Sequence, residues 1–243
     1  MPSGVFLDLA SLHPQDLELS ILRGLLDDWR EYPATAPDEH LAHIGQADVV
    51  VLNRAVLDRA VFEAVPHLKL VCVTATGTNN IDLDAAVEHR VAVSNVRAHA
   101  TDSVTQYVIA VMLAHHTRLF ACHAAVRAGD WSHNAQFCLL DHPVRELRGM
   151  TLGIIGYGEL GRGVARLAEA FGMQILIAQR NADDARPGRV PLDHPLLAPD
   201  LPNLILTPHT AWAGRAARQA VLDQTVANIR GWLAGQPCNR VTD

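Results

Sequence analysis

A glycine-rich loop with the spacing G-x-G-x-x-G occupies six consecutive residues: Gly156, Tyr157, Gly158, Glu159, Leu160 and Gly161. It follows an apolar run and opens a helical pattern, which is the context in which such a loop binds the pyrophosphate of a dinucleotide. The first glycine permits a tight turn, the second lets the pyrophosphate approach the backbone, and the third lets the helix pack on the strand. A strand-to-helix turn without a ligand is the alternative, and this context favours the dinucleotide site.

The residues that would contact the ribose leave the choice between NAD and NADP open. In dinucleotide sites an acidic residue about 20 positions after the glycines holds the ribose 2′-hydroxyl. Here that position carries Gln179, and Arg180 follows it. Gln179 can hydrogen-bond a ribose, whereas Arg180 could pair with a 2′-phosphate or could simply be a solvated charge in a loop.

Apolar runs and helical patterns alternate along the chain and predict the elements that hold this loop. Near-continuous Val and Leu runs are typical of strands buried on both faces, so we expect an α/β fold with parallel sheets. Strands are predicted at Val5–Leu9, Trp29–Tyr32, Asp48–Leu52, Leu68–Thr74, Val91–Val96, Thr151–Ile155, Gln174–Ala178 and Asn203–Leu206. Helices are predicted at Asp16–Leu26, Glu39–Gln46, Asp58–Val65, Asp82–His89, Thr101–Arg127, Glu159–Phe171 and Arg215–Leu233, the last stopped by Gly235.

The composition excludes several classes of protein. The 243 residues are 49% hydrophobic and 19% charged, which is enough to bury a core. The net charge of −6 and the dispersed basic residues argue against a nucleic-acid partner. No apolar stretch reaches the roughly 18 residues of a membrane helix, and no signal peptide is recognisable, so we expect no membrane association and a cytoplasmic location. Four scattered cysteines and thirteen histidines without ligand spacing argue against a disulfide framework or a metal site.

Four segments together resemble the D-isomer-specific 2-hydroxyacid dehydrogenase family, most closely its members that act on hydroxypyruvate, glycerate and glyoxylate. The segments are Ala75–Asp82, the long helical pattern after Thr101-Asp102-Ser103, Glu146–Gly149 leading into the glycine loop, and Thr207–Trp212. The resemblance implies two Rossmann-like or flavodoxin-like domains. Residues 1–98, completed by a C-terminal helix in 214–243, would form the substrate domain, and residues 99–213 a truncated dinucleotide-binding domain. It also implies a homodimer built around the long helix and residues 128–148.

The resemblance assigns roles to individual residues. Backbone amides of Thr76 and Gly77 would hold the substrate carboxylate, and His209 would be the acid/base in hydride transfer between NAD(P)H and a small 2-keto or 2-hydroxy acid. A glycine-containing turn after a strand is a place where an anion meets free N–H groups, which agrees with the first assignment. Asn53, at the end of an apolar strand, could line the substrate pocket or could make a turn.

The sequence lacks two stretches that this family carries before the histidine. One, N-x-x-R-G, supplies an arginine for the substrate carboxylate, and the other, D-V-x-x-x-E-P, supplies a glutamate that pairs with the histidine. Asp193 instead runs directly into His194, as though roughly 60 residues, or two βαβ units, were missing. The alternative function is therefore a catalytically impaired dinucleotide-binding or dimeric interaction module of the same family.

Overall fold

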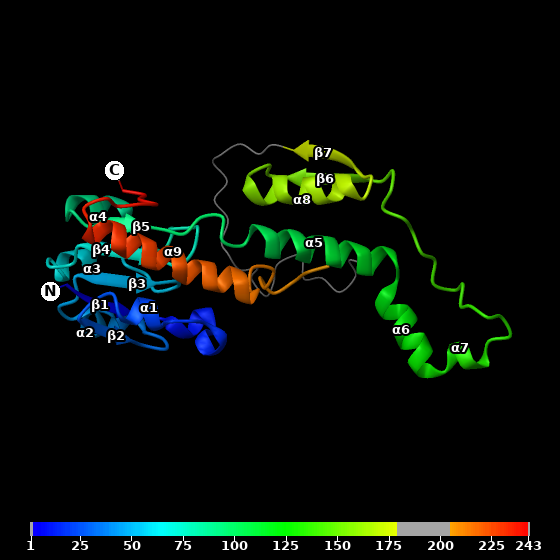
Figure 1. Ribbon diagram of the computed structural model, residues 1–243, viewed down its shortest axis with the longest axis horizontal. Helices are drawn as coiled ribbons and strands as arrows, with labels where there is room; N and C mark the ends of the chain where they lie inside the picture. Colours follow the sequence, from blue (N-terminus) through cyan, green and yellow to red (C-terminus); the bar gives the residue numbers. More distant parts are fainter. Residues whose placement is uncertain (1, 179–204, 243) are drawn as a thin grey trace. The chain divides into compact units, whose positions relative to one another are not determined.

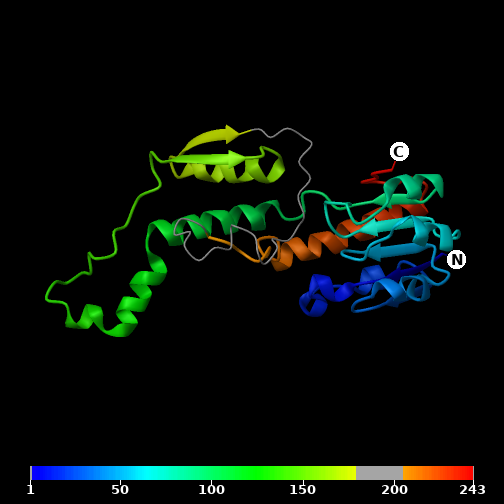
Figure 2. The ribbon, with the colours of Figure 1, turned by 180° about the vertical axis from the view of Figure 1, so that it is seen from behind.

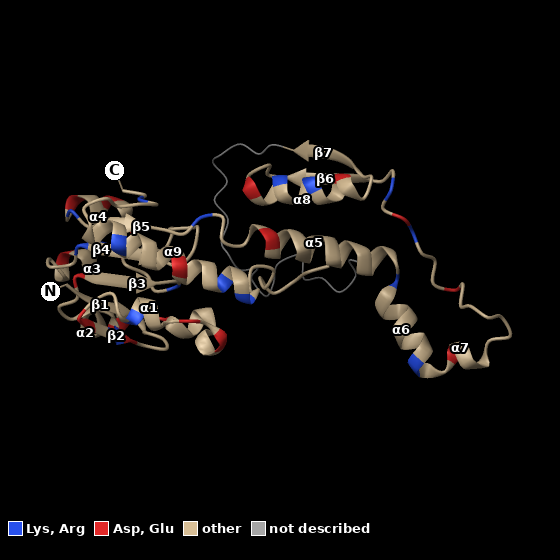
Figure 3. Ribbon diagram, in the orientation of Figure 1, with Lys and Arg blue, Asp and Glu red and all other residues tan. Residues whose placement is uncertain are grey.

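A computed structural model describes residues 2–178 and 205–242 of the chain, which divides into two compact units. The first unit comprises residues 1–100 and 213–243, and the second comprises residues 101–212. Acidic and basic residues are interspersed along the described parts of both units (Figure 3). The assignment of a substrate role to the first unit and a dinucleotide role to the second stays a prediction.

The first unit is built on a five-stranded parallel sheet with the strand order β2-β1-β3-β4-β5 (Figure 1). Its strands are β1 (Ser3–Phe6), β2 (Asp28–Glu31), β3 (Val49–Leu52), β4 (Leu70–Val73) and β5 (Ala92–Ser94). Its helices are α1 (Ser20–Arg23), α2 (His40–Ile44), α3 (Arg59–Ala64), α4 (Leu83–Glu88) and α9 (Arg215–Leu233). Three short 3-10 turns lie at Leu9–Leu12, Pro14–Asp16 and Pro37–Glu39. This is the flavodoxin-like order of a doubly wound fold, so the predicted fold class is confirmed.

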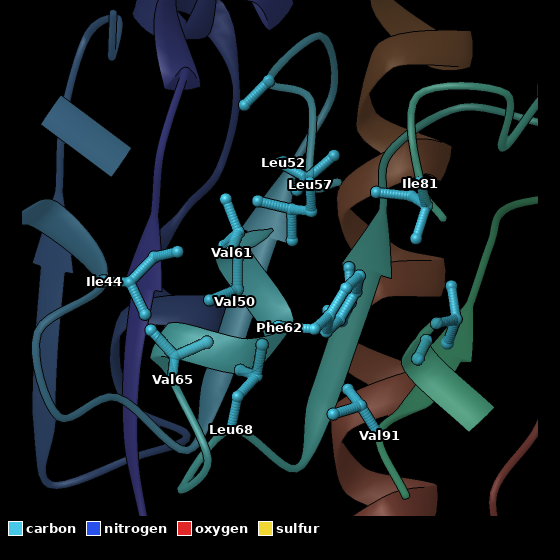
Figure 4. Packing of buried hydrophobic residues seen from close by; sticks show 14 of the residues in the cluster. Ile44, Val50, Leu52, Leu57, Val61, Phe62, Val65, Leu68, Ile81 and Val91 are labelled. Atoms are coloured by element: carbon cyan, nitrogen blue, oxygen red, sulfur yellow. The ribbon is translucent and has the colours of Figure 1, made fainter. Parts of the chain in front are cut away.

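The central strands are buried on both faces, as their unbroken apolar sequences predict. Val50 and Leu52 of β3 face a cluster that includes Val61 and Phe62 of α3 (Figure 4). The alternate side chains of β3 are fully buried on the opposite side. There α9 lies against β4, as both views of the ribbon show (Figures 1 and 2). The sheet therefore has a helix layer on each face, and α9 brings the C-terminal part of the chain into the first unit.

The predicted helix over Asp16–Leu26 is wrong for most of its length. Only Ser20–Arg23 are α-helical, preceded by the 3-10 turn at Pro14–Asp16. Leu19, Leu22 and Leu26 are nevertheless buried, so apolar residues of this segment pack inward. Tertiary packing therefore buries these leucines although the segment does not form a continuous helix.

The second unit contains α5 (Thr101–His116), α6 (Leu119–Ala128), α7 (Asp130–His133), β6 (Thr151–Ile155), α8 (Glu159–Ala170) and β7 (Gln174–Ala178). Strands β6 and β7 pair in parallel over five residues each. Helix α8 packs on α5 at Gly163, where an added Cβ would lie 2.7 Å from Thr105 Oγ1. Residues 205–206, the described part of the predicted strand Asn203–Leu206, are not in a strand, and residues 203–204 lie outside the described residues.

The single long helix predicted over Thr101–Arg127 is also wrong, because two helices occupy this segment. The chain bends by 52° between α5 and α6, and Arg118 adopts a left-handed conformation at the break with φ 55°. Within the described part of the chain, no single helix is long and apolar enough to cross a membrane, and α5 with α6 meets that measure only as a bent pair.

Arg218 of α9 anchors this helix to the segment that precedes α1. The residue is 8% exposed, and its guanidinium donates to the carbonyl oxygens of Leu12, His13 and Ala213. Its Nη1 and Nη2 also contact Oδ1 and Oδ2 of Asp16, at 2.7 and 2.8 Å, with Nη1 shared between Asp16 and the two carbonyl groups of Leu12 and His13. These hydrogen bonds lower the pKa of Asp16 from 3.8 to about 2.

Replacement of Asp16 by Asn should remove one component of the acid sensitivity of the first unit. Because the folded-state pKa of Asp16 is lowered, its contribution to the free energy of unfolding is complete above pH 4 and is lost as pH falls towards 2. We therefore expect the stability difference between wild type and Asp16→Asn to shrink across that window in urea unfolding followed by circular dichroism. A difference that grows as pH falls would contradict this assignment.

Candidate functional site

The loop after β4 presents two exposed backbone donors. Thr76 and Gly77 are exposed, and their N–H groups donate to no acceptor within residues 2–178 and 205–242. The loop closes on itself where the N–H of Ile81 donates to the carbonyl oxygen of Thr78 at 3.0 Å. Free N–H groups at the carboxyl end of a parallel strand can bind an anion such as a carboxylate.

Asn53 lies in the turn after β3, beside this loop. The side chain of Asn80 connects the two, because its amide donates to the carbonyl oxygens of Asn53 at 3.3 Å and Ala55 at 2.8 Å. The carboxamide of Asn53 itself donates to Ser11 Oγ at 3.0 Å. The turn with Asn53 and the loop with Thr76 and Gly77 are thus joined by hydrogen bonds. The side chain of Asn53 is engaged with Ser11.

The turn that carries Asn53 is held by a buried carboxylate. Asp8, 7% exposed and two residues after β1, accepts hydrogen bonds from three consecutive N–H groups: those of Asn53, Arg54 and Ala55, at 2.8, 2.5 and 3.0 Å. A buried carboxylate with three N–H donors is well compensated for its desolvation. Asp8 therefore fixes the edge of the predicted substrate pocket without being free to bind a ligand.

A surface hollow of about 590 Å³ adjoins the same loop. Its lining includes Gly77, Asn79, Asp82 and Asp84. Asp82 caps α4 by accepting from the N–H of Ala85 at 2.9 Å. Asp82 and Asp84 make their part of this hollow unfavourable for an anion, so the candidate anion site is limited to the free amides of Thr76 and Gly77.

The glycine loop of the second unit has the conformation that its sequence predicts. Gly156 has φ +90°, a region in which side chains are strained, and its N–H donates to the carbonyl oxygen of Ala178 at 3.2 Å. Gly158 is the N-cap of α8 and provides no side-chain hydrogen bond to it. A Cβ at Gly161 would overlap the carbonyl oxygen of Gly156, so this position requires glycine.

The loop fits a dinucleotide phosphate. Glu159 and Leu160, the first residues of α8, are exposed and leave their N–H groups at a helix N-terminus. No atom lies within 4 Å of a Cβ built on Gly156 or Gly158, so the space above the loop is open. Glu159 also accepts a hydrogen bond from Thr101 Oγ1 of α5. Gln179 and Arg180, predicted to contact the ribose, lie outside the described residues.

His209 lies in an exposed segment of the second unit. It has φ +58°, which is uncommon for a residue other than glycine, and its N–H donates to the carbonyl oxygen of Thr207 at 2.9 Å. Among the described residues its imidazole has no hydrogen-bonding or ionic partner. The ring is thus available for proton transfer and is not fixed by a described carboxylate.

Asp8, Asn80 and Asn95 support the candidate substrate loop, and sequence reasoning did not select them. Asn95 follows β5, and its side-chain amide donates to the carbonyl oxygen of Thr76 at 2.7 Å. A usable signal was present, since Asp8 and Asn95 are polar residues near the carboxyl ends of the predicted strands Val5–Leu9 and Val91–Val96. Such residues in a parallel sheet lie at the carboxyl edge, where ligands bind.

Residues 11–243 match the sequence model of the D-isomer specific 2-hydroxyacid dehydrogenase catalytic domain. The chain is 30% identical to a glycerate dehydrogenase of Methylorubrum extorquens, over 98% of each protein. It is 27% identical to a hydroxypyruvate reductase of Blautia hydrogenotrophica, again over 98% of each. The first alignment spans 311 positions, 68 more than the 243 residues of this chain, so the relative contains internal segments with no counterpart here.

Solved structures show the same fold at low identity. An acyclic imino acid reductase, solved with NADPH and D-Arg, has a TM-score of 0.77 and 19% identity over 98% of this chain and 99% of that one. An NADPH-dependent glyoxylate/hydroxypyruvate reductase from Sinorhizobium meliloti has a TM-score of 0.74 and 19% identity over 99% of this chain and 97% of that one.

Substitution of Gly161 by Ala tests the packing of the glycine loop. The added Cβ would collide with the carbonyl oxygen of Gly156, so we expect the second unit to lose about 2 kcal/mol of stability. The matched control is Gly153→Ala in β6, where nothing lies within 4 Å of the new Cβ. Thermal unfolding measured by calorimetry should separate the two variants, and equal melting curves would contradict the close packing.

Proposed function

The chain belongs to the D-isomer-specific 2-hydroxyacid dehydrogenase family, and we propose that it transfers a hydride between NAD(P)H and a small 2-keto or 2-hydroxy acid. Hydroxypyruvate or glyoxylate is the proposed type of substrate, because the relatives carry the names of enzymes that act on these acids. Two binding elements carry the proposal. One is the loop after β4, residues 75–82, with the free amides of Thr76 and Gly77, which we call the anion loop. The other is the open glycine loop at Gly156–Gly161.

The glycine loop is proposed to hold the cofactor through its backbone. The N–H groups at the start of α8 and the positive end of that helix favour the pyrophosphate. Open space at Gly156 and Gly158 admits the phosphates close to the main chain. When bound, the reduced nicotinamide would supply the hydride that reaches the carbonyl carbon of the substrate.

The proposed role of Thr76 and Gly77 is to hold the carboxylate of the acid. Each N–H can donate one hydrogen bond, and hydrogen bonds to a charged oxygen are about twice as strong as neutral ones. A carboxylate held in this way orients the adjacent carbonyl group, since the two carbons are directly bonded. Orientation of the reacting carbonyl is a large part of the rate enhancement in such reactions.

His209 is proposed as the acid/base. In reduction, a ring nitrogen of its imidazolium donates a proton to the carbonyl oxygen as hydride arrives at the carbon, which gives a hydroxyl group. In oxidation the neutral ring accepts that proton from the hydroxyl. Histidine suits both directions, because its ordinary pKa lies near working pH.

The same family supports a second candidate function, a module that binds dinucleotide with impaired catalysis. The sequence contains neither the N-x-x-R-G nor the D-V-x-x-x-E-P stretch, and the alignment with the glycerate dehydrogenase leaves 68 or more positions without a counterpart. Without the arginine the substrate carboxylate loses a charge partner. Without the glutamate the imidazolium of His209 loses its stabilising anion, and each loss is expected to cost orders of magnitude in rate.

Turnover distinguishes the two functions. The purified chain is mixed with NADH or NADPH and hydroxypyruvate, and the absorbance of the reduced nicotinamide is followed. An enzyme consumes the cofactor, and His209→Gln should then lower kcat by about 100-fold or more with the cofactor Kd within about twofold of wild type. Cofactor-dependent thermal stabilisation without turnover would favour the binding module. Neither response would exclude both functions, and unchanged kcat in the variant would exclude the role of His209.

We also propose a homodimer. Large apolar side chains are exposed over the segment that follows α5: Leu119 (55%), Phe120 (75%), Val126 (48%), Trp131 (52%), Phe137 (88%), Leu140 (80%) and Val144 (62%). So many exposed apolar residues within 26 positions are typical of an interface. A second copy of the chain would bury them from both sides.

Replacement of Phe120 by Glu should weaken this dimer, because a charge would replace an aromatic ring in the buried patch. We expect wild type to sediment at twice 26.4 kDa in analytical ultracentrifugation and the variant to dissociate at about 30-fold higher concentration or more. Val87→Glu on α4, half-exposed in the first unit, is the control and should leave the dimer intact. A monomeric wild type would contradict the proposal.

The cytoplasm is the proposed location. All four cysteines are free thiols, and burial raises the pKa of Cys72. Cys122, Cys138 and Cys238 are half-buried. Free thiols in a chain of this size are typical of a reducing compartment.

A further inference from the structure

Asn95 contacts the proposed anion loop from the side opposite to the free amides. It is 5% exposed, directly after β5, and its Nδ2 donates to the carbonyl oxygen of Thr76 at 2.7 Å. Next to it, the N–H of Val96 donates to the carbonyl oxygen of Ala75 at 3.2 Å. Two consecutive carbonyl groups of the loop are therefore held from the β5 side.

This contact determines the direction of one of the free N–H groups. The peptide bond between Thr76 and Gly77 is trans, because the chain contains no cis peptide in its described part. In a planar trans peptide the C=O and the following N–H point in opposite directions. A Thr76 carbonyl held by Asn95 thus directs the N–H of Gly77 away from Asn95, towards the exposed side of the loop.

Asn95 is itself fixed by α9. Asn228, 1% exposed, donates from Nδ2 to the carbonyl oxygen of Asn95 at 2.9 Å, and the N–H of Asn95 donates to the carbonyl oxygen of Asn239 at 3.1 Å. The Oδ1 of Asn228 accepts from Cys238 Sγ at 3.2 Å and from Asn239 Nδ2 at 3.0 Å. A continuous hydrogen-bonded path therefore joins the C-terminal residues to the Thr76 carbonyl.

We propose that Asn95 is a positioning residue for substrate binding: it orients the Gly77 N–H towards the carboxylate, and Asn228 holds it in place. The inference rests on the proposed function, since it concerns the same anion site. Asn95 itself would not touch the substrate, because its amide is engaged with Thr76. The loop amide would then be oriented before the ligand arrives, which lowers the entropic cost of binding.

A purely structural role for Asn95 makes a different prediction. In that case its replacement lowers stability and leaves the affinity for a carboxylate unchanged in the molecules that remain folded. A positioning role lowers the affinity for the carboxylate as well. Without the hydrogen bond from Asn95, the peptide between Thr76 and Gly77 can rotate, and the Gly77 N–H then points in other directions. Affinity measured well below the melting temperature of each variant therefore separates the two roles.

The test uses the full 15N-labelled chain and oxamate, a stable analogue of a small 2-keto acid, titrated with and without NADH. In wild type, oxamate should shift the amide signals of Thr76 and Gly77 in NMR spectra. Asn95→Ala should raise the oxamate Kd about tenfold. Asn95→Asp, nearly isosteric, should raise it at least as much, because the carboxylate removes the donor to the Thr76 carbonyl.

The matched control is Gln219→Ala, on the same helix as Asn228. Gln219 also holds a backbone segment, since its Oε1 accepts from the N–H of Glu18 at 2.9 Å and its Nε2 donates to the carbonyl oxygen of Glu18 at 3.2 Å. That segment lies outside the anion loop. We expect Gln219→Ala to leave the oxamate Kd within about twofold of wild type.

The outcomes separate the inference from the proposed function. If oxamate shifts the Thr76 and Gly77 signals equally in wild type and in both Asn95 variants, Asn95 has no positioning role and the anion site stands. If these signals do not move in wild type, the anion site fails and the inference fails with it. Wild type gives a check that does not depend on variant folding: because the proposal has the Gly77 amide oriented before the ligand arrives, the side-chain amide of Asn95 should already be hydrogen-bonded and ordered without oxamate. An Asn95 side-chain amide that becomes ordered only when oxamate is added would overturn the proposal.

Discussion

Side-chain hydrogen bonds to the main chain hold the loops at the carboxyl edge of the five-stranded sheet. Asp8 accepts from three N–H groups of the turn after β3, Asn80 donates to two carbonyl groups of that turn, and Asn95 donates to the loop after β4. Parallel strands end together at one edge, where the backbone groups lose their pairing partners. Polar side chains that replace those partners keep the loops in one conformation, and the exposed amides of Thr76 and Gly77 depend on that conformation.

The C-terminal helix α9 completes this arrangement through amide side chains. Gln219, Gln224 and Asn228 each hydrogen-bond the main chain of another segment: Glu18, Arg97 and Asn95, respectively. Arg218 adds the hydrogen bonds to Leu12, His13 and Asp16. Because these contacts join residues more than 120 positions apart, the first unit requires both ends of the chain.

The second unit has a complete glycine loop on a small sheet. Of β6 and β7, Ile155 is 75% exposed and Leu176 is 64% exposed, while Ile154 is buried against α8. Strands of a doubly wound fold are ordinarily covered on both faces, so these exposures are what the loss of βαβ units would produce. The sequence also contains neither the N-x-x-R-G nor the D-V-x-x-x-E-P stretch, and the alignment with the glycerate dehydrogenase is 68 positions longer than this chain.

The α/β class, most of the strands and helices, and the glycine loop could be predicted from the sequence, because apolar periodicity and the need for glycine at Gly156 and Gly161 are local properties. The folded structure showed where the leucines of 16–26 pack without a long helix, and that the chain bends at Arg118. It also showed the support of the anion loop by Asn95 and Asn228, which are 133 positions apart. Such contacts depend on which strands become neighbours in the sheet, and the order of strands in the sheet cannot be predicted from residue spacing along the chain.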